Sequence, residues 1–153
     1  MLILCDIDGV IADPCEYVKK YLLSTPPNWT EYFMYTGAFP IIPGVVELVR
    51  GMLRDGHLVV FHTGRPESNR EATRAYMLRY LPELQELVGR LRMRPDGNRS
   101  PSAQLKLANC RMYGPALVIE DEPAAVQLLS KAGYTVLQVC GHRFDGSEDR
   151  VPD

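Results

Sequence analysis

The sequence predicts a three-layer α/β domain, in which helices cover both faces of a central parallel sheet. Short apolar runs that suit strands alternate with stretches of helical periodicity, a pattern typical of right-handed strand–helix–strand units. The chain has 153 residues, of which 46% are hydrophobic and 24% are charged, so it carries enough apolar material for one core. We therefore expect a single domain over residues 1–153.

The expected strands are apolar along their whole length, which suits burial on both faces of a parallel sheet. The four clear runs lie at 2–5, 57–62, 116–119 and 134–139, and 91–94 is a weaker fifth candidate. Because connections between parallel strands cross the sheet through helices, the intervals between these runs should be helical.

Helical patterns do fill these intervals, at 45–53, 67–81, 101–111 and 123–132. The first helix should stop at Gly56 and the second before Pro82, since both residue types end helices. The third should begin near Pro101, with Ser100 or Ser102 as its N-cap.

Residues 13–43 interrupt the alternation. This segment is rich in aromatic residues and prolines, and Glu31 is the only charged residue between positions 21 and 46. It begins directly after an acidic loop, so we expect a small helical insertion over the mouth of a site rather than a second domain. Most of its aromatic side chains should pack the insertion onto the domain, because aromatic residues dominate cores.

Composition and charge exclude several classes of function. The net charge is −2, so the chain is not a polycation that binds nucleic acid non-specifically. It has no apolar run of about 18 residues, as a membrane-spanning helix needs, and no signal-peptide pattern. The four cysteines lack metal-site spacing, and we expect reduced thiols in a cytoplasmic protein. The polar tail at 145–153 is expected to be mobile.

Polar groups follow three of the expected strands directly. These groups are Asp6, Asp8, Thr63, Gly64, Glu120 and Asp121, with Lys106 on the third expected helix. Ligands bind at the carboxyl ends of the strands in open α/β sheets, so the groups should meet at one edge. The first two carboxylates share one loop and repel unless a divalent cation offsets them. The hydroxyl group and the lysine suit an anionic, phosphoryl-like ligand.

In this order, the groups resemble the four motifs of the haloacid dehalogenase (HAD) superfamily of phosphohydrolases. The matching residues, in motif order, are Asp6-Ile7-Asp8-Gly9-Val10-Ile11-Ala12-Asp13, then Thr63-Gly64-Arg65, then Lys106, then Glu120-Asp121. The resemblance spans residues 2 to about 139, nearly the whole chain. It implies a Rossmann-like HAD fold with a small helical cap at about 13–43, and phosphomonoester hydrolysis.

The resemblance also implies catalytic roles. Asp6 would be the nucleophile that forms an aspartyl-phosphate. Asp8 would protonate the leaving oxygen and later take a proton from the attacking water. Thr63 and Lys106 would hold the phosphoryl oxygens, where negative charge develops in the transition state.

Magnesium is the implied cofactor, since oxygen ligands favour Mg²⁺ over zinc. Asp6, the backbone carbonyl of Asp8, and Asp121 with help from Glu120 would form its site. The fourth motif often carries two aspartates, and here the first of them is Glu120. Its longer side chain leaves open whether it reaches the metal directly or through water.

A closer resemblance, to the 3′-phosphatase domain of phage polynucleotide kinase/phosphatases, bears on the substrate. It rests on Arg92-Met93-Arg94-x-Asp96-x-x-Arg99, on His62-Thr63-Gly64-Arg65 and on the stretch 133–139. It implies a phosphorylated nucleic acid end or a nucleotide as substrate, bound by Gly64, Arg65, Arg94 and Arg99. Arg65 has the alternative of bridging to Glu67.

Two further features bear on the same substrate. Trp29, Tyr32 and Tyr35 are the candidates for stacking on bases. The phosphate-binding loop of a kinase is absent from the sequence, so a kinase would be a separate partner.

Three alternatives remain open at the level of sequence. A 5′(3′)-nucleotidase or other small-molecule phosphatase would use the same catalytic residues. A phospho-accepting receiver shares carboxylates, a hydroxyl and a lysine on an α/β sheet, but in a different order along the chain. A non-catalytic binding protein on the same fold would be expected to lack Asp6 or Asp8, and both are present.

Overall fold

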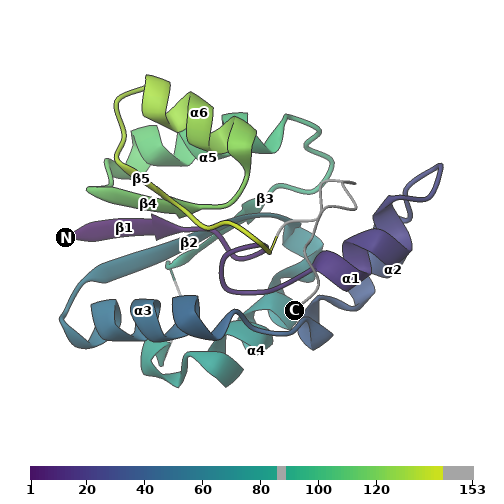
Figure 1. Ribbon diagram of the computed structural model, residues 1–153, viewed down its shortest axis with the longest axis horizontal. Helices are drawn as coiled ribbons and strands as arrows, with labels where there is room; N and C mark the ends of the chain where they lie inside the picture. The colour runs from purple at the N-terminus through teal and green to yellow at the C-terminus, as the bar shows by residue number, and fades with distance from the viewer. Residues whose placement is uncertain (86–88, 143–153) are drawn as a thin grey trace.

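The computed structural model describes residues 1–85 and 89–142, so the expected tail at 145–153 lies outside the described residues. Its centre is a five-stranded parallel sheet with the strand order β3-β2-β1-β4-β5 (Figure 1). The strands are β1 (Leu2–Cys5), β2 (Leu58–Pro66), β3 (Leu91–Arg94), β4 (Leu117–Glu120) and β5 (Val136–Gln138). The predicted α/β class is confirmed, and all five expected strands are present. β2 runs four residues further than its apolar sequence suggests, because Pro66 pairs with Arg94 of β3.

The inner strands are buried on both faces, as their unbroken apolar sequences indicate. Successive side chains of a strand point to opposite faces. Ile3 and Cys5 of β1 therefore join the larger core cluster on one side of the sheet, while Leu4 joins the smaller cluster on the other. Ile119 and Val118 of β4 divide in the same way.

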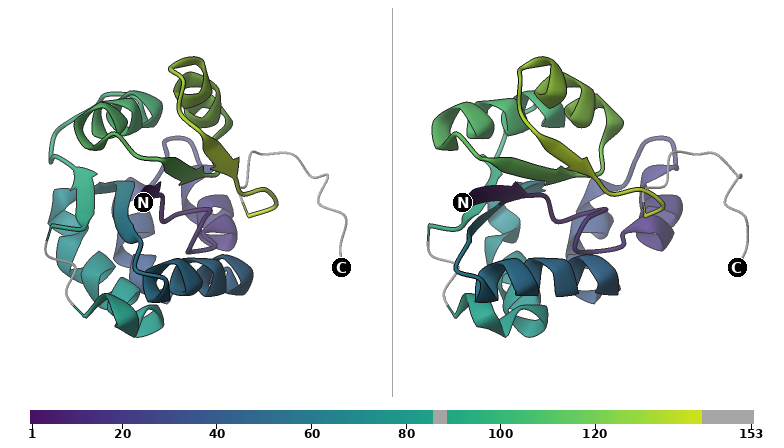
Figure 2. Two further views of the ribbon diagram at one scale, coloured as in Figure 1. Left: turned by 90° about the vertical axis from the view of Figure 1, so that its left-hand side faces the viewer. Right: turned by 60° about the vertical axis from the view of Figure 1, so that its left-hand side comes forward.

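Helices form the two outer layers. α3 (Pro43–Arg54) and α4 (Arg70–Tyr80) cover one face of the sheet, and α5 (Ser102–Tyr113) and α6 (Pro123–Lys131) cover the other (Figure 1). Figure 2 shows the same layers from two further sides. Short 3₁₀ turns, η3 (Glu67–Asn69) and η4 (Pro82–Leu84), flank α4.

Two of the predicted helices begin differently in the structure. The stretch predicted to be helical from 67 begins with the 3₁₀ turn η3 and becomes α-helical at Arg70. The expected serine N-cap of α5 is wrong, because Pro101 occupies that position and no side chain caps this helix within the described residues. Ser102 is already the first helical residue.

The direction of the chain across the sheet reverses at β1. From β1 the chain passes through α3 to β2 and β3 on one side, and α5 then returns it to β4 on the other side of β1. Such a switch point leaves a crevice beyond the carboxyl ends of the two central strands. Asp6 directly follows β1, and Asp121 directly follows β4.

Between β1 and α3 lie the short elements α1 (Cys15–Tyr17), η1 (Val18–Leu22), α2 (Trp29–Met34) and η2 (Thr36–Ala38), beyond the carboxyl ends of the central strands (Figure 1). Aromatic contacts hold this insertion together. Phe39 is fully buried, and its ring centroid lies 4.6 Å from that of Tyr17 and 5.3 Å from that of Tyr32. Most aromatic side chains therefore pack the insertion onto the sheet domain, as expected.

Two smaller observations complete the fold. Within residues 1–85 and 89–142, no helix is long and apolar enough to cross a membrane. No disulfide joins the cysteines, all of which lie in these ranges.

Candidate active site

Asp6 stands where the two central strands end. Its backbone N–H donates to the carbonyl of Ile119 in β4 (2.9 Å), so the loop after β1 starts in register with β4. The N–H of Ile7 donates to Asp6 Oδ1 at 2.7 Å. The carboxylate is therefore buried in a defined orientation, as an in-line nucleophile requires.

Lys106 of α5 lies between two buried carboxylates. Its Nζ is 2.6 Å from Asp6 Oδ2, 2.7 Å from Glu120 Oε1 and 3.5 Å from an oxygen of Glu122. Burial by itself would lower the pKa of Lys106, but the charges of Asp6 and Glu120 raise it well above its usual value. Burial would likewise raise the pKa of Asp6, but the attraction of Lys106 and His62 and the hydrogen bonds from Lys106 and Ile7 hold it below its usual value. Asp6 is therefore ionised at neutral pH.

Glu120 has one satisfied and one unsatisfied carboxylate oxygen. Oε1 accepts hydrogen bonds from Lys106 and from the N–H groups of Asp121 and Glu122. Oε2 is buried and has no hydrogen-bond partner among the described residues. Burial and the charge of Asp6 raise the pKa of Glu120 well above its usual value, against the opposing effect of Lys106.

Asp6, Glu120 and Asp121 form a buried acidic group in which one carboxylate oxygen of each lies within 4.8 Å of the others. All three donors are oxygens, which suits a hard divalent cation such as Mg²⁺. Glu120 Oε2, which has no hydrogen-bond partner among the described residues, is a further oxygen that such a cation would bind. These residues fit the metal that the motifs imply.

Gly9 is required by the close approach of Asp121. A Cβ atom at position 9 would lie 2.1 Å from Asp121 Oδ2, far inside van der Waals contact. The residue also has φ +82°, a conformation that glycine adopts without strain. The turn at Gly9 therefore makes room for Asp121.

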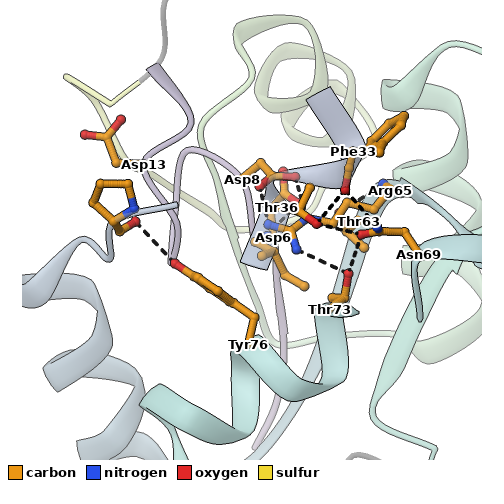
Figure 3. A network of polar contacts seen from close by, with 12 residues as sticks. Asp6, Asp8, Asp13, Phe33, Thr36, Thr63, Arg65, Asn69, Thr73 and Tyr76 are labelled. Carbon is orange, nitrogen blue, oxygen red and sulfur yellow. Dashed lines mark hydrogen bonds and ion pairs between the residues drawn. The ribbon is translucent and has the colours of Figure 1, made fainter. Parts of the chain in front are cut away.

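The side chain of Asp8 is not part of the acidic group, because it faces Arg65 (Figure 3). Arg65 Nε donates to Asp8 Oδ2 at 2.9 Å and NH2 to Asp8 Oδ1 at 2.7 Å. The carboxylate of Asp8, whose backbone carbonyl is the predicted metal ligand, is therefore not one of the three carboxylates that lie together.

Arg65 was expected either to bind substrate or to bridge to Glu67. The bridge is wrong, since Glu67 pairs with Arg70. The Arg65 side chain is buried and holds Asp8, and Arg65 is also among the residues that line the cavity described below.

Thr63 and His62 come from the end of β2. Thr63 Oγ1 accepts a hydrogen bond from the N–H of Arg65 at 3.1 Å, which leaves its hydroxyl proton for an anionic oxygen. His62 is fully buried, and neither ring nitrogen has a hydrogen-bond partner within the described part of the chain. Burial, reinforced by the charge of Lys106, lowers the pKa of His62 to about 4 despite the opposing charge of Asp6.

The site borders a cavity of about 740 Å³, within the range of small-ligand sites. Asp6, Asp8, Thr63, Lys106 and Asp121 all line it. The part of the lining that comes from the insertion consists of Pro14, Val18, Leu22, Trp29, Tyr32 and Phe33. Sequence reasoning did not single out the aliphatic residues or the phenylalanine, because an apolar insertion residue can equally well face the core.

The three aromatic residues singled out from sequence have different positions. Trp29 is 53% exposed, lines the cavity and stacks on Phe33 with the ring centroids 5.7 Å apart. Tyr32 also lines the cavity but is 5% exposed. Tyr35 stacks on Tyr21 and is not among the residues that line this cavity.

A third wall contains the two predicted arginines beside Gly64. Arg94 donates hydrogen bonds to the carbonyls of Gly64 (3.1 Å), Asn98 (3.3 Å) and Ser100 (2.6 Å), so it fixes the loop between β3 and α5. Arg99 is exposed, lines the cavity and makes no ion pair with any residue that the structure describes. Arg99 is therefore the open cationic contact at this wall.

Comparison with known proteins gives no match to a protein-family model and no match to a curated protein. Solved structures do match. One is a chain of a Pnkp1/Rnl/Hen1 RNA repair complex, with a TM-score of 0.69 and 17% identity over 90% of this chain and 42% of that chain. A D,D-heptose 1,7-bisphosphate phosphatase from B. bronchiseptica, complexed with magnesium and phosphate, has a TM-score of 0.58 and 19% identity (88% and 78% covered).

A HAD hydrolase from Entamoeba histolytica matches with a TM-score of 0.58 and 13% identity, over 88% of this chain and 82% of that chain. The protein has the haloacid dehalogenase fold. Its resemblance to these structures is one of fold, and the chain spans less than half of the matched chain in the RNA repair complex. The HAD fold predicted from the four motifs is thereby confirmed.

The His62 side chain should make the protein less stable in acid. Its pKa in the folded protein is about 4, whereas an unfolded histidine titrates at about 6.5. Between these values only the unfolded state binds the proton, so the free energy of unfolding falls as the pH falls from about 6.5 to about 4, by about 3 kcal/mol for this group. We expect His62→Leu to remove this part of the pH dependence.

Urea unfolding of the wild type and of His62→Leu, at about pH 4.5 and at about pH 7, measures the effect. The difference between the two proteins isolates His62 from the other groups that titrate in this range. Equal pH dependence in both proteins would contradict the prediction.

Proposed function

We propose that the protein is a Mg²⁺-dependent phosphomonoester hydrolase that acts through an aspartyl-phosphate on Asp6. The observation that carries this proposal is the position of Lys106, held between Asp6 and Glu120 beside a buried carboxylate oxygen that lacks a partner among the described residues. It leaves Asp6 ionised, oriented and at the cavity surface, next to a cation that can bind a phosphoryl oxygen.

Asp6, Glu120 and Asp121, together with the backbone carbonyl of Asp8, would hold the Mg²⁺. When bound, the metal ion offsets the repulsion between a phosphate monoester and the carboxylates. The fold neighbour that is complexed with magnesium and phosphate supports this assignment.

The chemistry has two balanced steps. In the first, a carboxylate oxygen of Asp6 forms a bond to phosphorus, the bond from phosphorus to the leaving oxygen breaks, and Asp8 gives that oxygen its proton. In the second, Asp8 takes a proton from water as the water oxygen attacks phosphorus, and the bond to Asp6 breaks to release phosphate. Thr63 and Lys106 bind the phosphoryl oxygens in both steps.

The proposed substrate is a 3′-phosphorylated nucleic acid end. The stacked Trp29–Phe33 pair gives the cavity an aromatic wall on which a base can stack, and the open cation of Arg99 lies at the wall beside Gly64. A fold neighbour from an RNA repair complex supports the same class. A 5′(3′)-nucleotidase is the second candidate, since the aromatic wall suits a free nucleotide equally well.

The proposal includes a separate kinase as partner and a cytoplasmic location. The chain spans 42% and 47% of the two chains that it matches in Pnkp1/Rnl/Hen1 complexes. The division of residues 1–153 into one phosphatase domain with a cap at about 13–43 belongs to the same proposal.

Phosphate release from a 3′-phosphorylated oligonucleotide, with Mg²⁺ or with a chelator, tests the function. We expect metal-dependent release that is faster than from the matching 3′-mononucleotide. Asp6→Asn should abolish turnover because the nucleophile is lost, and Asp8→Asn should lower kcat at least about 100-fold because general acid–base catalysis is lost. Release from the mononucleotide alone would favour the nucleotidase. Full activity of Asp6→Asn would disprove the covalent mechanism.

Gly9→Ala should abolish metal binding. The new Cβ displaces Asp121 Oδ2, which it would approach to 2.1 Å. Gly56→Ala is the matched control, because Gly56 also has a positive φ (+78°) but has no described atom within 4 Å of the position that its new methyl group would take. Both variants carry a backbone cost of about 1–2 kcal/mol.

Thermal unfolding with and without Mg²⁺ separates the two effects. Mg²⁺ should raise the Tm of the wild type and of Gly56→Ala but not that of Gly9→Ala. An equal rise in all three proteins would show that Asp121 does not contribute to a metal site.

Trp29 is the single tryptophan of the chain, so its fluorescence reports on the aromatic wall. A 3′-phosphorylated oligonucleotide added to the inactive Asp6→Asn variant should quench this fluorescence, because a base stacks on the half-exposed indole. Inorganic phosphate, which has no base, is the control and should leave the signal unchanged. Binding of the oligonucleotide without quenching would rule out stacking at Trp29.

A further inference from the structure

We propose that Thr73 and Asn69 are positioning residues, which hold the acid–base carboxylate of Asp8 through Arg65 and connect it to the insertion. This inference rests on the proposed phosphatase function. It assigns a role in that reaction to two residues of α4 and its N-terminus that carry none of the four motifs.

The first part of the connection runs from the acid to α4 (Figure 3). Arg65 holds both oxygens of Asp8 with Nε and NH2, and its third nitrogen, NH1, donates to Thr73 Oγ1 at 3.2 Å. Thr73 Oγ1 in turn donates to Asn69 Oδ1 at 3.0 Å. The Thr73 hydroxyl thus accepts a hydrogen bond from Arg65 and donates its one proton to Asn69, which fixes the direction of its O–H bond.

The second part runs from α4 to the insertion. Asn69 Nδ2 donates to the backbone carbonyl of Phe33 at 3.0 Å. Thr36 Oγ1 lies 3.0 Å from Asn69 Oδ1 and 3.0 Å from the same Phe33 carbonyl, and its one proton can be donated to either. Asn69 is therefore bonded to both α2 and η2.

Burial makes these contacts decisive for the orientation of Arg65. Arg65, Thr73 and Thr36 are at most 1% exposed, so water cannot replace a lost partner. The guanidinium carbon lies 5.6 Å from the ring centroids of both Phe39 and Tyr76, which restrict it from two further directions. Among the described residues, the Thr73 hydroxyl is the hydrogen-bond partner that fixes the guanidinium at the end opposite Asp8.

The connection also reaches the cavity wall. Phe33, whose backbone carbonyl accepts the hydrogen bond from Asn69, contributes its side chain to the aromatic wall beside Trp29. One hydrogen-bonded set of residues therefore holds two parts of the site. These are the aromatic wall, which would contact the leaving group, and the Asp8 carboxyl group, which would protonate the leaving group. Loss of this set should impair proton transfer to the leaving oxygen more than it impairs attack by Asp6.

Thr73→Val tests this, because valine keeps the volume of threonine but cannot accept the hydrogen bond from Arg65. Two substrates separate proton transfer from attack: phenyl phosphate, whose leaving oxygen needs a proton, and p-nitrophenyl phosphate, whose phenolate leaves without one. We compare kcat/KM, because it reports only the steps up to release of the leaving group and excludes hydrolysis of the aspartyl-phosphate, which both substrates share. We expect kcat/KM for phenyl phosphate to fall about tenfold and kcat/KM for p-nitrophenyl phosphate to change less than about twofold.

Three variants serve as controls. Thr73→Ser keeps the hydroxyl and should restore the wild-type ratio of the two kcat/KM values. Asn69→Ala breaks the connection on the insertion side, at a partly exposed residue, and should show the same selective loss. Thr135→Val makes the same chemical change at an exposed residue that precedes β5, and should leave both rates unchanged. Equal losses for both substrates in Thr73→Val, or no loss for either, would overturn the positioning role.

A readout that needs no turnover keeps failure of the inference apart from failure of the proposed function. Exchange of the Arg65 Nε proton, followed by ¹H–¹⁵N NMR, should be slow in the wild type and in Thr73→Ser and at least about tenfold faster in Thr73→Val. If the wild type hydrolyses neither of these esters nor the 3′-phosphorylated oligonucleotide, the proposed function is wrong. Unchanged exchange in Thr73→Val would show that Thr73 does not hold Arg65 and would overturn the inference on its own.

Discussion

The site depends on the compensation of buried negative charge. Four carboxylates, on Asp6, Asp8, Glu120 and Asp121, converge at the ends of the two central strands, and two cations face them, Lys106 and Arg65. Glu122, 3.5 Å from Lys106, adds a fifth carboxylate, so negative charge is in excess at the site and a divalent cation would offset it. A proton on Glu120, favoured by burial and by Asp6, balances part of it without metal, so protons and metal should compete for this residue.

The two cations make the two halves of the charge cluster chemically different. Lys106 approaches from α5 and keeps Asp6 ionised beside the metal-binding oxygens. Arg65, at the end of β2, turns Asp8 away from those oxygens and toward the insertion. Two aspartates that are only two residues apart can therefore take the separate roles of nucleophile and acid–base group, because each has its own counter-ion.

The insertion is part of both the cavity and its support. Its aromatic residues bury Phe39 and Tyr32, which attach it to the domain, and leave Trp29 and Phe33 to form a wall of the cavity. Hydrogen bonds from Asn69 hold the backbone of this wall, and Tyr76 of α4 makes a second connection by donating to the Pro40 carbonyl at 3.2 Å. A segment of about 30 residues thus borders the substrate site without needing a core of its own.

The sequence by itself determined the layers, the parallel strands and the place of the acidic groups, because apolar runs that end in polar residues are local patterns. It also predicted that Asp6, Asp8 and Asp121 would converge, since parallel strands end at one edge of a sheet. Tertiary structure decided what each group contacts. The pairing of Arg65 with Asp8, the need for Gly9 beside Asp121 and the contact of Asn69 with Phe33 join segments far apart in the chain. No local pattern encodes such contacts, because they depend on how the packed layers orient each side chain.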